Sequence, residues 1–323
     1  NLTPSQDSEI KALCEDAGIK LTIIGIDKLA EDIYLFHHIL SRDFLGISIS
    51  TDQIQSCDDF IIRYNSNRMA APIDTKFLFR EKEFEDIKNA FLKVDVVILN
   101  GAAGTGKTRL ALHYAKNHPD ASNEKVYCIH SNALPIYEDL KLFIDSPGNY
   151  FLFIDDANQL SGLQHIIRYV TMKQEGYNVK ILITVRDYAL QKVINDVREI
   201  TSFETININV FTDDEIKKLL ETSLGILNQD YHERIIRIAE GNARIAILAG
   251  KVACESDRLD SISDASQLYE DYYGSSLGDN QLFANKHICI TAGIVAFLEA
   301  IHLDHIDAFL PTLQEKGLNR DEF

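Results

Sequence analysis

The chain has 323 residues, 46% of them hydrophobic and 25% charged, so it is long enough for two or three domains that each bury a core. Its formal net charge of −17 weighs against a large nucleic-acid-binding surface, and no apolar run approaches the length of a membrane span. Five scattered cysteines without a C-x-x-C pair favour reduced thiols in the cytoplasm over a disulfide framework or a zinc site. Because the chain begins with Asn1 instead of Met, we expect it to be a piece of a longer protein.

The N-terminal part of the chain carries weaker patterns than the rest. Residues 8–17 have helical spacing, and Gly18 is a plausible stop for that helix. Residues 19–25 are predicted to form a strand. Residues 26–40 place Leu29 and further apolar residues on one helical face, which predicts an amphipathic helix.

A short motif in the first predicted helix, Asp7 with Glu9-Ile10-Lys11, superficially matches the carboxylate set of metal-dependent nucleases. Glu9 falls on a helical pattern instead of a strand, so we predict that this chain alone does not cut DNA. His37 and His38 are adjacent, and neighbouring helical residues do not face one metal ion. A solvated or satisfied pair is the better interpretation.

Asn, Ser, Ala and Pro dominate residues 65–74, which predicts a linker. An amphipathic helix follows and ends near Leu92. Phe79 and Arg80 stand just before this helix, where an apolar residue followed by Arg can form the wall of an adenine pocket. The same residues also fit a plain helix start with a core Phe pair.

The strongest motif is residues 101–108, Gly-Ala-Ala-Gly-Thr-Gly-Lys-Thr, which fits the phosphate-loop template. An apolar run at residues 94–99 predicts a buried strand before it, and residues 109–115 predict a helix after it. Its three glycines let the backbone fold around phosphates and turn N–H groups toward them. Lys107 can reach the β- and γ-phosphates, and the Thr108 hydroxyl can ligate Mg²⁺. The sequence therefore predicts binding of a nucleoside triphosphate.

A Walker B pattern follows at residues 150–156, where an apolar run ends in two acids. A buried parallel strand brings its C-terminal acid to the sheet edge that holds the phosphate loop. We predict that Asp155 holds Mg²⁺, directly or through water. Asp156 is placed to orient or deprotonate the attacking water.

The next predicted strand, residues 179–185, delivers Thr184 and Arg186 to that same edge. An arginine there can sense the γ-phosphate, and the alternative is a surface charge at a strand end. With further strands at residues 126–129 and 205–210, the alternation with helices predicts a parallel, doubly wound sheet.

After the sheet the pattern becomes helical. Thr212-x-x-Glu215 is a capping box that opens one helix, residues 231–240 predict a second, and Ala243 starts a third. These helices predict a small lid.

In this order the motifs resemble those of STAND NTPases, the signal-transducing branch of the AAA+-like ATPases. The resemblance covers about residues 72–323 and is carried by residues 79–81, 101–108, 151–156, 183–186 and 241–244. Among STAND proteins the chain looks most like the bacterial antiviral (Avs) type, in which a restriction-nuclease-like N-terminal domain precedes the ATPase.

The resemblance implies an α/β fold in which a P-loop NTPase sheet is followed by a helical lid and a partial winged-helix region and preceded by a small α/β remnant. The implied domains are residues 1–70 (nuclease-like remnant and bridge, with the bridge at 45–74), 71–210 (NTPase core), 211–255 (lid) and 256–323 (linker and winged-helix-like region).

The resemblance also implies an ATP-dependent cytoplasmic switch that hydrolyses ATP slowly and assembles with copies of itself when triggered by a phage protein. DNA would be only the target of a fused nuclease, and no membrane is involved. The implied catalytic residues are Lys107, Asp156 and Arg186, and the Mg²⁺ ligands are Thr108 and Asp155. The implied ATP contacts are Phe79, Arg80, Gly101, Ala102, Ala103, Gly104, Thr105, Gly106, Lys107, Thr108, Arg109 and Arg244.

The sequence departs from the family pattern in two places, since Phe79 replaces a common Gly and Ala243 replaces a common Pro. Candidates for a nucleotide-reading histidine are His287, His302 and His305, by location only. The main rival is an AAA+ ATPase of the DNA-associated initiator type, whose second sensor resembles residues 241–244. A nucleotide-binding scaffold without turnover is a third possibility.

Overall fold

A computed structural model describes residues 4–37, 39–47, 49, 51–66, 73, 77–132, 134, 136–172 and 176–256. The chain divides into two compact units. In the described part, the first contains the sheet, the N-terminal helices and Gly241–Arg244, and the second contains Ile216–Glu240 and the residues from Ile245 onward. In the described part of the chain, no helix has the length and apolarity needed to cross a membrane.

A six-stranded sheet in the order β1-β3-β4-β5-β2-β6 forms the core of the first unit. All neighbouring strands run parallel except β1 and β3, which are antiparallel. The strands are β1 Ile54–Gln55, β2 Val96–Gly101, β3 Lys125–Ile129, β4 Gly148–Ile154, β5 Tyr177–Arg186 and β6 Phe203–Asn207. The predicted α/β class and parallel sheet are therefore confirmed.

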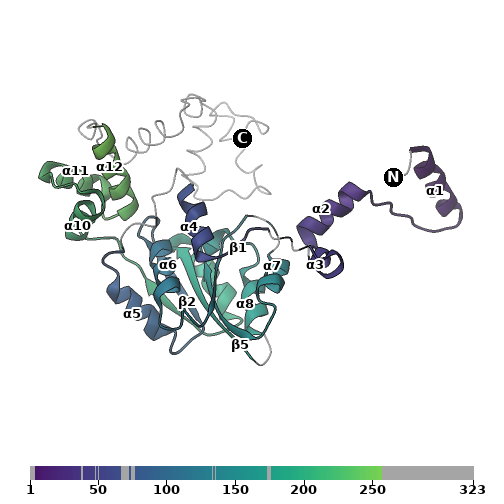
Figure 1. Cartoon of the computed structure of the whole chain (residues 1–323), viewed down its shortest axis with the longest axis horizontal. Coiled ribbons are helices and arrows are strands. Elements are labelled where there is room, and N and C mark those ends of the chain that lie inside the picture. Colours follow the sequence, from purple (N-terminus) through teal and green to yellow (C-terminus); the bar gives the residue numbers. More distant parts are fainter. Residues whose placement is uncertain are drawn as a thin grey trace. The chain divides into compact units, whose positions relative to one another are not determined.

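Helices cover both faces of the sheet because alternate strand residues point to opposite sides. Ile98 and Leu152 pack on one side with α7 (Tyr137–Phe143), α8 (Leu163–Thr171) and α9 (Leu190–Arg198). Leu99 and Phe153 pack on the other with α4 (Cys57–Ser66), α5 (Glu81–Ala90) and α6 (Lys107–Asn117). Figure 1 shows α5 and α6 on one side of the sheet and α7 and α8 on the other. Burial on both faces explains the continuous apolar runs of these strands.

The strand expected at residues 19–25 does not form. That segment lies without regular structure between α1 (Pro4–Asp16) and α2 (Ile26–Phe36), and its Ile19 and Ile24 are 58% and 56% exposed. A strand needs a partner for its backbone N–H and C=O groups, and the described residues supply none here. Gly18 does end the first helix, with a φ of +70°.

Residues 51–66 belong to the sheet domain, so the prediction of a bridge over 45–74 is wrong for this part. Ile54 pairs with Ile129 and is buried. Phe60 on α4 is also buried, with its ring centroid 5.7 Å from that of Phe153. The earlier α3 (Ile39–Leu45) continues the helical pattern of α2 after a break, where a single helix to residue 40 was expected.

In the described part of the chain, three helices follow the sheet, as predicted: α10 (Asp213–Leu224), α11 (Gln229–Ala239) and α12 (Ala243–Ser256). The capping box is present, because Thr212 N donates to Glu215 Oε2 over 2.8 Å and Glu215 N donates to Thr212 Oγ1 over 3.3 Å. The expected linker and winged-helix-like region, with His287, His302 and His305, lies outside the described residues.

The described cysteines are free thiols. Cys57 and Cys128 are buried together between α4 and β3, with their sulfur atoms 3.6 Å apart. They act there as small apolar core residues.

Candidate functional site: a phosphate loop at the carboxyl edge of the sheet

The loop between β2 and α6 is the predicted phosphate loop. Gly104 and Gly106 adopt φ values of +80° and +90°, a region that side-chain-bearing residues rarely occupy. Helix α6 begins at Lys107, directly after Gly106. The first N–H groups of a helix have no partner within it, so the loop is a ready-made binding site for anions.

Lys107 is buried, and its ammonium group donates hydrogen bonds to the carbonyl oxygens of Gly101 (2.7 Å) and Ala102 (2.8 Å). Burial lowers the pKa of this amine, while the nearby Asp156 carboxylate opposes that shift. The amine is therefore held at the loop by its own backbone, where a phosphate group competes directly for it.

Thr108, Asp155 and Thr184 form a hydrogen-bonded set beside the loop. The hydroxyl groups of Thr108 and Thr184 each donate to Asp155 Oδ1 over 2.8 Å. Burial raises the pKa of Asp155 to about 6, which marks a carboxylate that a cation would stabilise. A hydroxyl and a carboxylate are hard oxygen donors of the kind that Mg²⁺ prefers, so the predicted ligands Thr108 and Asp155 fit that ion.

Asp156 and Arg186 form an ion pair at the ends of the neighbouring strands β4 and β5. Arg186 Nη2 lies 2.8 Å from Asp156 Oδ2, and Arg186 Nε donates to Asp156 Oδ1 over 3.3 Å. Asp156 has left-handed backbone angles, φ 49° and ψ 53°, at the start of the short 3₁₀ helix Ala157–Gln159. Its N–H donates to Thr184 Oγ1 over 2.9 Å, so one threonine hydroxyl bonds the carboxylate of Asp155 and the backbone of Asp156.

The side chain of Arg80 binds other groups of the protein. Its guanidinium donates to Thr105 O (3.1 Å) and Asn209 O (2.7 Å) and pairs with Glu83 at 2.6 Å. Its side chain is only 6% exposed. The geometry therefore indicates a brace for the phosphate loop, and the contact of Arg80 with a nucleotide stays a prediction.

Phe79 adopts a φ of +62°, a conformation that is unfavourable for a bulky side chain. The ring of Phe79 packs edge-on against Phe211, with centroids 6.1 Å apart.

Asn242 is a site residue that sequence reasoning missed. Its side-chain amide donates to Ala103 O over 3.0 Å, and its Oδ1 accepts from Arg244 N over 3.0 Å. A Cβ atom on Gly104 would lie only 2.2 Å from Asn242 Oδ1. The signal that could have revealed it is an Asn between a helix-ending Gly and the start of α12, where a capping side chain is expected.

The remaining predicted contacts lie around the same loop. Ala102 and Ala103 are exposed, Thr105 is buried, and Arg109 sits half-buried in the first turn of α6. Gly101 is packed so closely that an added Cβ would lie 2.4 Å from Ile208 O. The backbone N–H of Arg244 also faces Gly104 O at 3.3 Å, so Arg244 begins its helix beside the loop.

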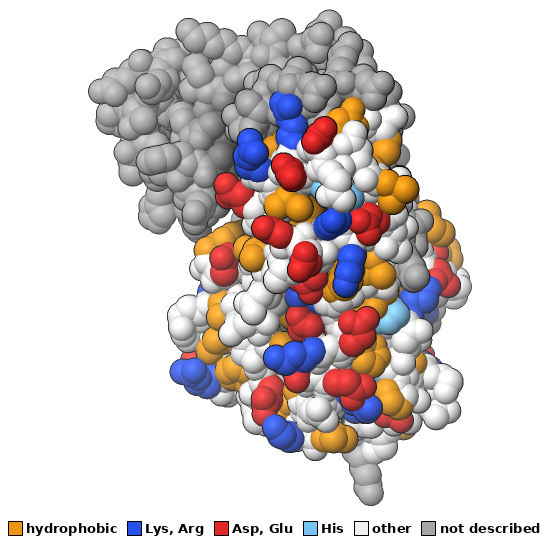
Figure 2. All heavy atoms as spheres, turned by 90° about the vertical axis from the view of Figure 1, so that its left-hand side faces the viewer, with side chains coloured by type: hydrophobic (Ala, Val, Ile, Leu, Met, Phe, Trp, Pro, Cys, Tyr) orange, Lys and Arg blue, Asp and Glu red, His pale blue; other side chains and the backbone are white. Residues whose placement is uncertain are grey.

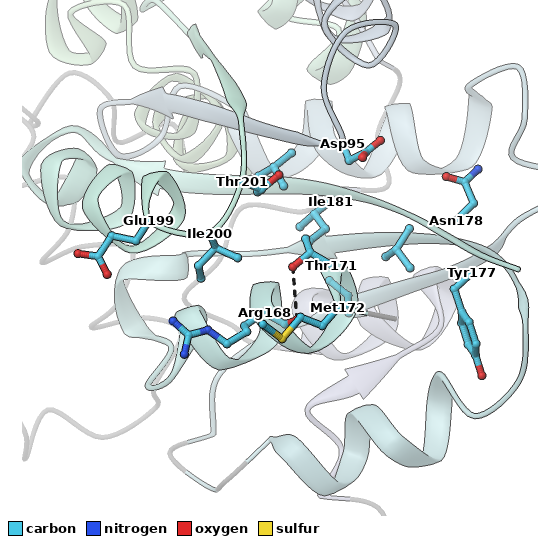
Figure 3. Close-up of a pocket in the computed structure, with 13 residues that line it drawn as sticks. Asp95, Arg168, Thr171, Met172, Tyr177, Asn178, Ile181, Glu199, Ile200 and Thr201 are labelled. Atoms are coloured by element: carbon cyan, nitrogen blue, oxygen red, sulfur yellow. Dashed lines mark hydrogen bonds between the residues drawn. The ribbon is translucent and has the colours of Figure 1, made fainter. Parts of the chain in front are cut away.

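A separate cavity of about 500 Å³ lies at the opposite ends of β2 and β5 and contains none of the predicted nucleotide residues. Its charged lining residues Asp95, Arg168 and Glu199 are exposed. In Figure 3, Arg168 and Glu199 extend to the same side, whereas Tyr177 lies at the other end of the group. No buried polar group is directed into it from the described residues, so we assign it no ligand.

A glycine-rich loop before a helix, with a threonine beside the acid of a nearby parallel strand, defines a P-loop NTPase. The comparison with protein families agrees, because the family described as Novel STAND NTPase 3 matches residues 78–225. This match supports a P-loop NTPase of STAND type and implies nucleotide binding. A search of curated proteins gives no match.

Among solved structures, the chain is similar to Orc1 of Aeropyrum pernix in complex with DNA, with 15% identity, coverage of 77% of this chain and 86% of that one, and a TM-score of 0.48. It is likewise similar to Cdc6p of Pyrobaculum aerophilum, with 15% identity, coverage of 79% and 85%, and a TM-score of 0.48. A mutant of RuvB from Thermotoga maritima is 16% identical, with coverage of 75% of this chain and 86% of that one, and a TM-score of 0.46. Similarities this distant carry no inference about what the present chain binds.

Proposed function

We propose that the chain is an ATP-binding and ATP-hydrolysing molecular switch. The observation that carries the proposal is the assembly at the carboxyl edge of the sheet. There the phosphate loop, the buried Lys107 and the linked Thr108 and Asp155 side chains occupy neighbouring positions. In this assembly the loop N–H groups and Lys107 hold the phosphates.

Each side chain then has a distinct role in hydrolysis. Thr108 and Asp155 would hold Mg²⁺, which would neutralise charge on the phosphates when bound. Asp156 orients the attacking water and accepts its proton. Arg186 contacts the γ-phosphate and stabilises the charge that develops there.

The switch part of the proposal rests on the segment Gly241–Arg244. Asn242 and Arg244 contact the carbonyl groups of Ala103 and Gly104, and the same segment continues directly into α12. A change in the phosphate loop would therefore reach the first turn of that helix. Self-assembly, a phage-protein trigger, a cytoplasmic location and a role in anti-phage defence are further parts of the proposal, and they rest on the resemblance of the sequence motifs alone.

The alternative function is a DNA-associated ATPase of the initiator type. The net charge of −17 counts against it. On the face of the described residues that Figure 2 shows, acidic and basic side chains are interspersed. A DNA-binding groove would instead have a cluster of basic side chains. Salt-dependent binding of duplex DNA by the chain would favour the alternative.

The test is the Lys107→Ala variant in a titration with Mg·ATP and Mg·ADP. Losing the buried ammonium group removes a charge-assisted contact to the phosphates, so we expect at least about a hundredfold weaker binding of ATP. Lys116→Ala is the matched control, because Lys116 lies on the same helix but pairs with Asp58 at 2.6 Å, and it should bind normally. Equal affinities of wild type and Lys107→Ala would refute the phosphate-loop assignment.

A further inference from the structure

Two groups to which the proposed function gives separate tasks are bound to each other. The guanidinium of Arg186 and the carboxylate of Asp156 make a two-point contact, at 2.8 Å and 3.3 Å. Their side chains are 37% and 29% exposed, so the pair is open to a ligand in solvent. While the contact lasts, Arg186 cannot place those donors on a phosphate, and Asp156 cannot use those oxygens for water.

The two partners differ in how firmly they are held. The backbone of Asp156 is fixed by its N–H bond to Thr184, and its Oδ2 also accepts from Gln159 over 2.8 Å. Arg186 carries a long side chain at the end of β5, where it hydrogen-bonds the carboxylate of Asp156 and the side chain of Tyr188, which is itself exposed. The arginine is therefore the partner that moves when the pair separates.

The local charge balance explains what would separate them. Lys107 and Arg186 carry positive charge, and Asp155, Asp156 and Asp187 carry negative charge, so these five groups together carry one negative charge. The charges of Asp156 and Arg186 both affect the pKa of Lys107, so both groups lie within electrostatic reach of the phosphate loop. A triphosphate brings one more phosphoryl group than a diphosphate, and a guanidinium binds phosphate oxygens in the same forked way that it binds a carboxylate.

We propose that Asp156 competes with the terminal phosphate of ATP for Arg186 and thereby sets the preference of the site for ATP over ADP. This inference rests on the proposed function. ADP leaves the ion pair closed. ATP opens it, and the same movement releases the Asp156 carboxylate to orient water, so the acid becomes available only when there is a γ-phosphate to attack.

The test is a double-mutant cycle on the ratio of the dissociation constants for ADP and for a slowly hydrolysed ATP analogue, ATPγS, both with Mg²⁺. The variants are Asp156→Asn, Arg186→Met and the double variant. Asparagine tolerates the left-handed backbone of position 156 well, so this change preserves the local structure. Asp187→Asn is the matched control, since it also removes an acid that acts on Lys107, but its carboxylate accepts from the backbone N–H of Tyr188.

Asp156→Asn should raise the ratio about threefold to tenfold, as expected for loss of a partly exposed ion pair that ATP must break. Arg186→Met should lower it, and in that background Asp156→Asn should have no further effect. If Asp156→Asn raises the ratio equally with and without Arg186, or no more than Asp187→Asn does, a general field effect is responsible and the competition is refuted. If the wild type binds neither nucleotide, the proposed function fails and the competition fails with it.

Discussion

Apolar side chains are buried in the strands of the sheet domain, whereas large ones are exposed in the N-terminal helices. In β2, Val96, Val97, Ile98 and Leu99 are all 0% exposed. In the N-terminal part, Phe44 on α3 is 81% exposed. Both regions have amphipathic or apolar patterns in the sequence, but only one of them closes these side chains off from water.

The difference shows that a β-favouring sequence becomes a strand only when a partner strand is available. Ile183 on β5 lies in register with Ile98 on one side and Ile154 on the other. Residues 19–25 have a similar apolar content, yet no described strand lies beside them. Local preference is therefore necessary for a strand but not sufficient.

The largest effect should come from removing a ring in the sheet. Phe153 is fully buried in β4 and packs with Phe60. Phe153→Ala removes its contacts and leaves a cavity, so we expect the free energy of unfolding to fall by about 3–5 kcal/mol. Urea denaturation followed by circular dichroism measures this change.

Phe44→Ala is the comparison variant. With its ring 81% exposed, we expect a change within about 0.5 kcal/mol. A loss similar to that of Phe153→Ala would mean that the N-terminal helices bury this ring in solution, and the contrast between the two regions would then be wrong.

Much of the sheet could be predicted because buried parallel strands are continuous apolar runs that stand out in a sequence. β1 could not be predicted in the same way. It has two residues, Ile54 and Gln55, and it is defined only by antiparallel pairing with Ile129 and Cys128. Nothing in so short a segment identifies a partner that far along the chain.

The candidate site likewise contains residues that could be predicted from the sequence and residues that could not. Lys107, Thr108 and Asp155 could be identified because their chemistry requires fixed spacings or a strand end, and the structure brings the three together. The bracing role of Arg80 and the loop contact of Asn242 depend on partners 129 and 139 residues away. Such contacts are set by the assembled fold, which a local pattern does not contain.

A smaller effect should distinguish a glycine within the site from one outside the sheet. Gly104 and Gly46 both have positive φ, +80° and +67°. Alanine at either position costs about 1 kcal/mol through the backbone. At Gly104 the new methyl group also displaces Asn242, so its bond to Ala103 is lost, which adds about 1 kcal/mol and weakens nucleotide binding.

The combination of Gly104→Ala with Asn242→Ala checks that reason. Removing the Asn242 side chain relieves the clash, so Gly104→Ala should cost less stability in that background than in the wild type. An equal cost in both backgrounds would exclude the contact with Asn242 as its source. Gly46→Ala should leave nucleotide affinity unchanged, since nothing lies within 4 Å of its added Cβ.

The smallest effect concerns a partly buried histidine, His130, on acidification. Burial, and then the Arg63 guanidinium 3.2 Å from its Nδ1, lower the pKa of His130 to about 4. An unfolded histidine titrates near pH 6.5, so between pH 6.5 and 4 the unfolded chain binds the proton and the folded chain resists it. His130 therefore contributes stability above pH 6.5 that is lost as the pH falls toward 4.

Because His130 is only partly buried, solvent screening reduces this contribution to about 1 kcal/mol. Asp155, whose pKa is raised to about 6, acts in the opposite direction over the same range, since its folded form takes up a proton first. The pH dependence of the wild-type unfolding free energy therefore combines the contributions of His130 and Asp155.

The informative quantity is the difference in unfolding free energy between wild type and His130→Gln, measured at pH 7 and at pH 4.5. The wild type should lose about 1 kcal/mol of stability relative to His130→Gln between pH 7 and pH 4.5. Parallel curves for wild type and His130→Gln would mean that the Arg63 contact does not hold His130 neutral.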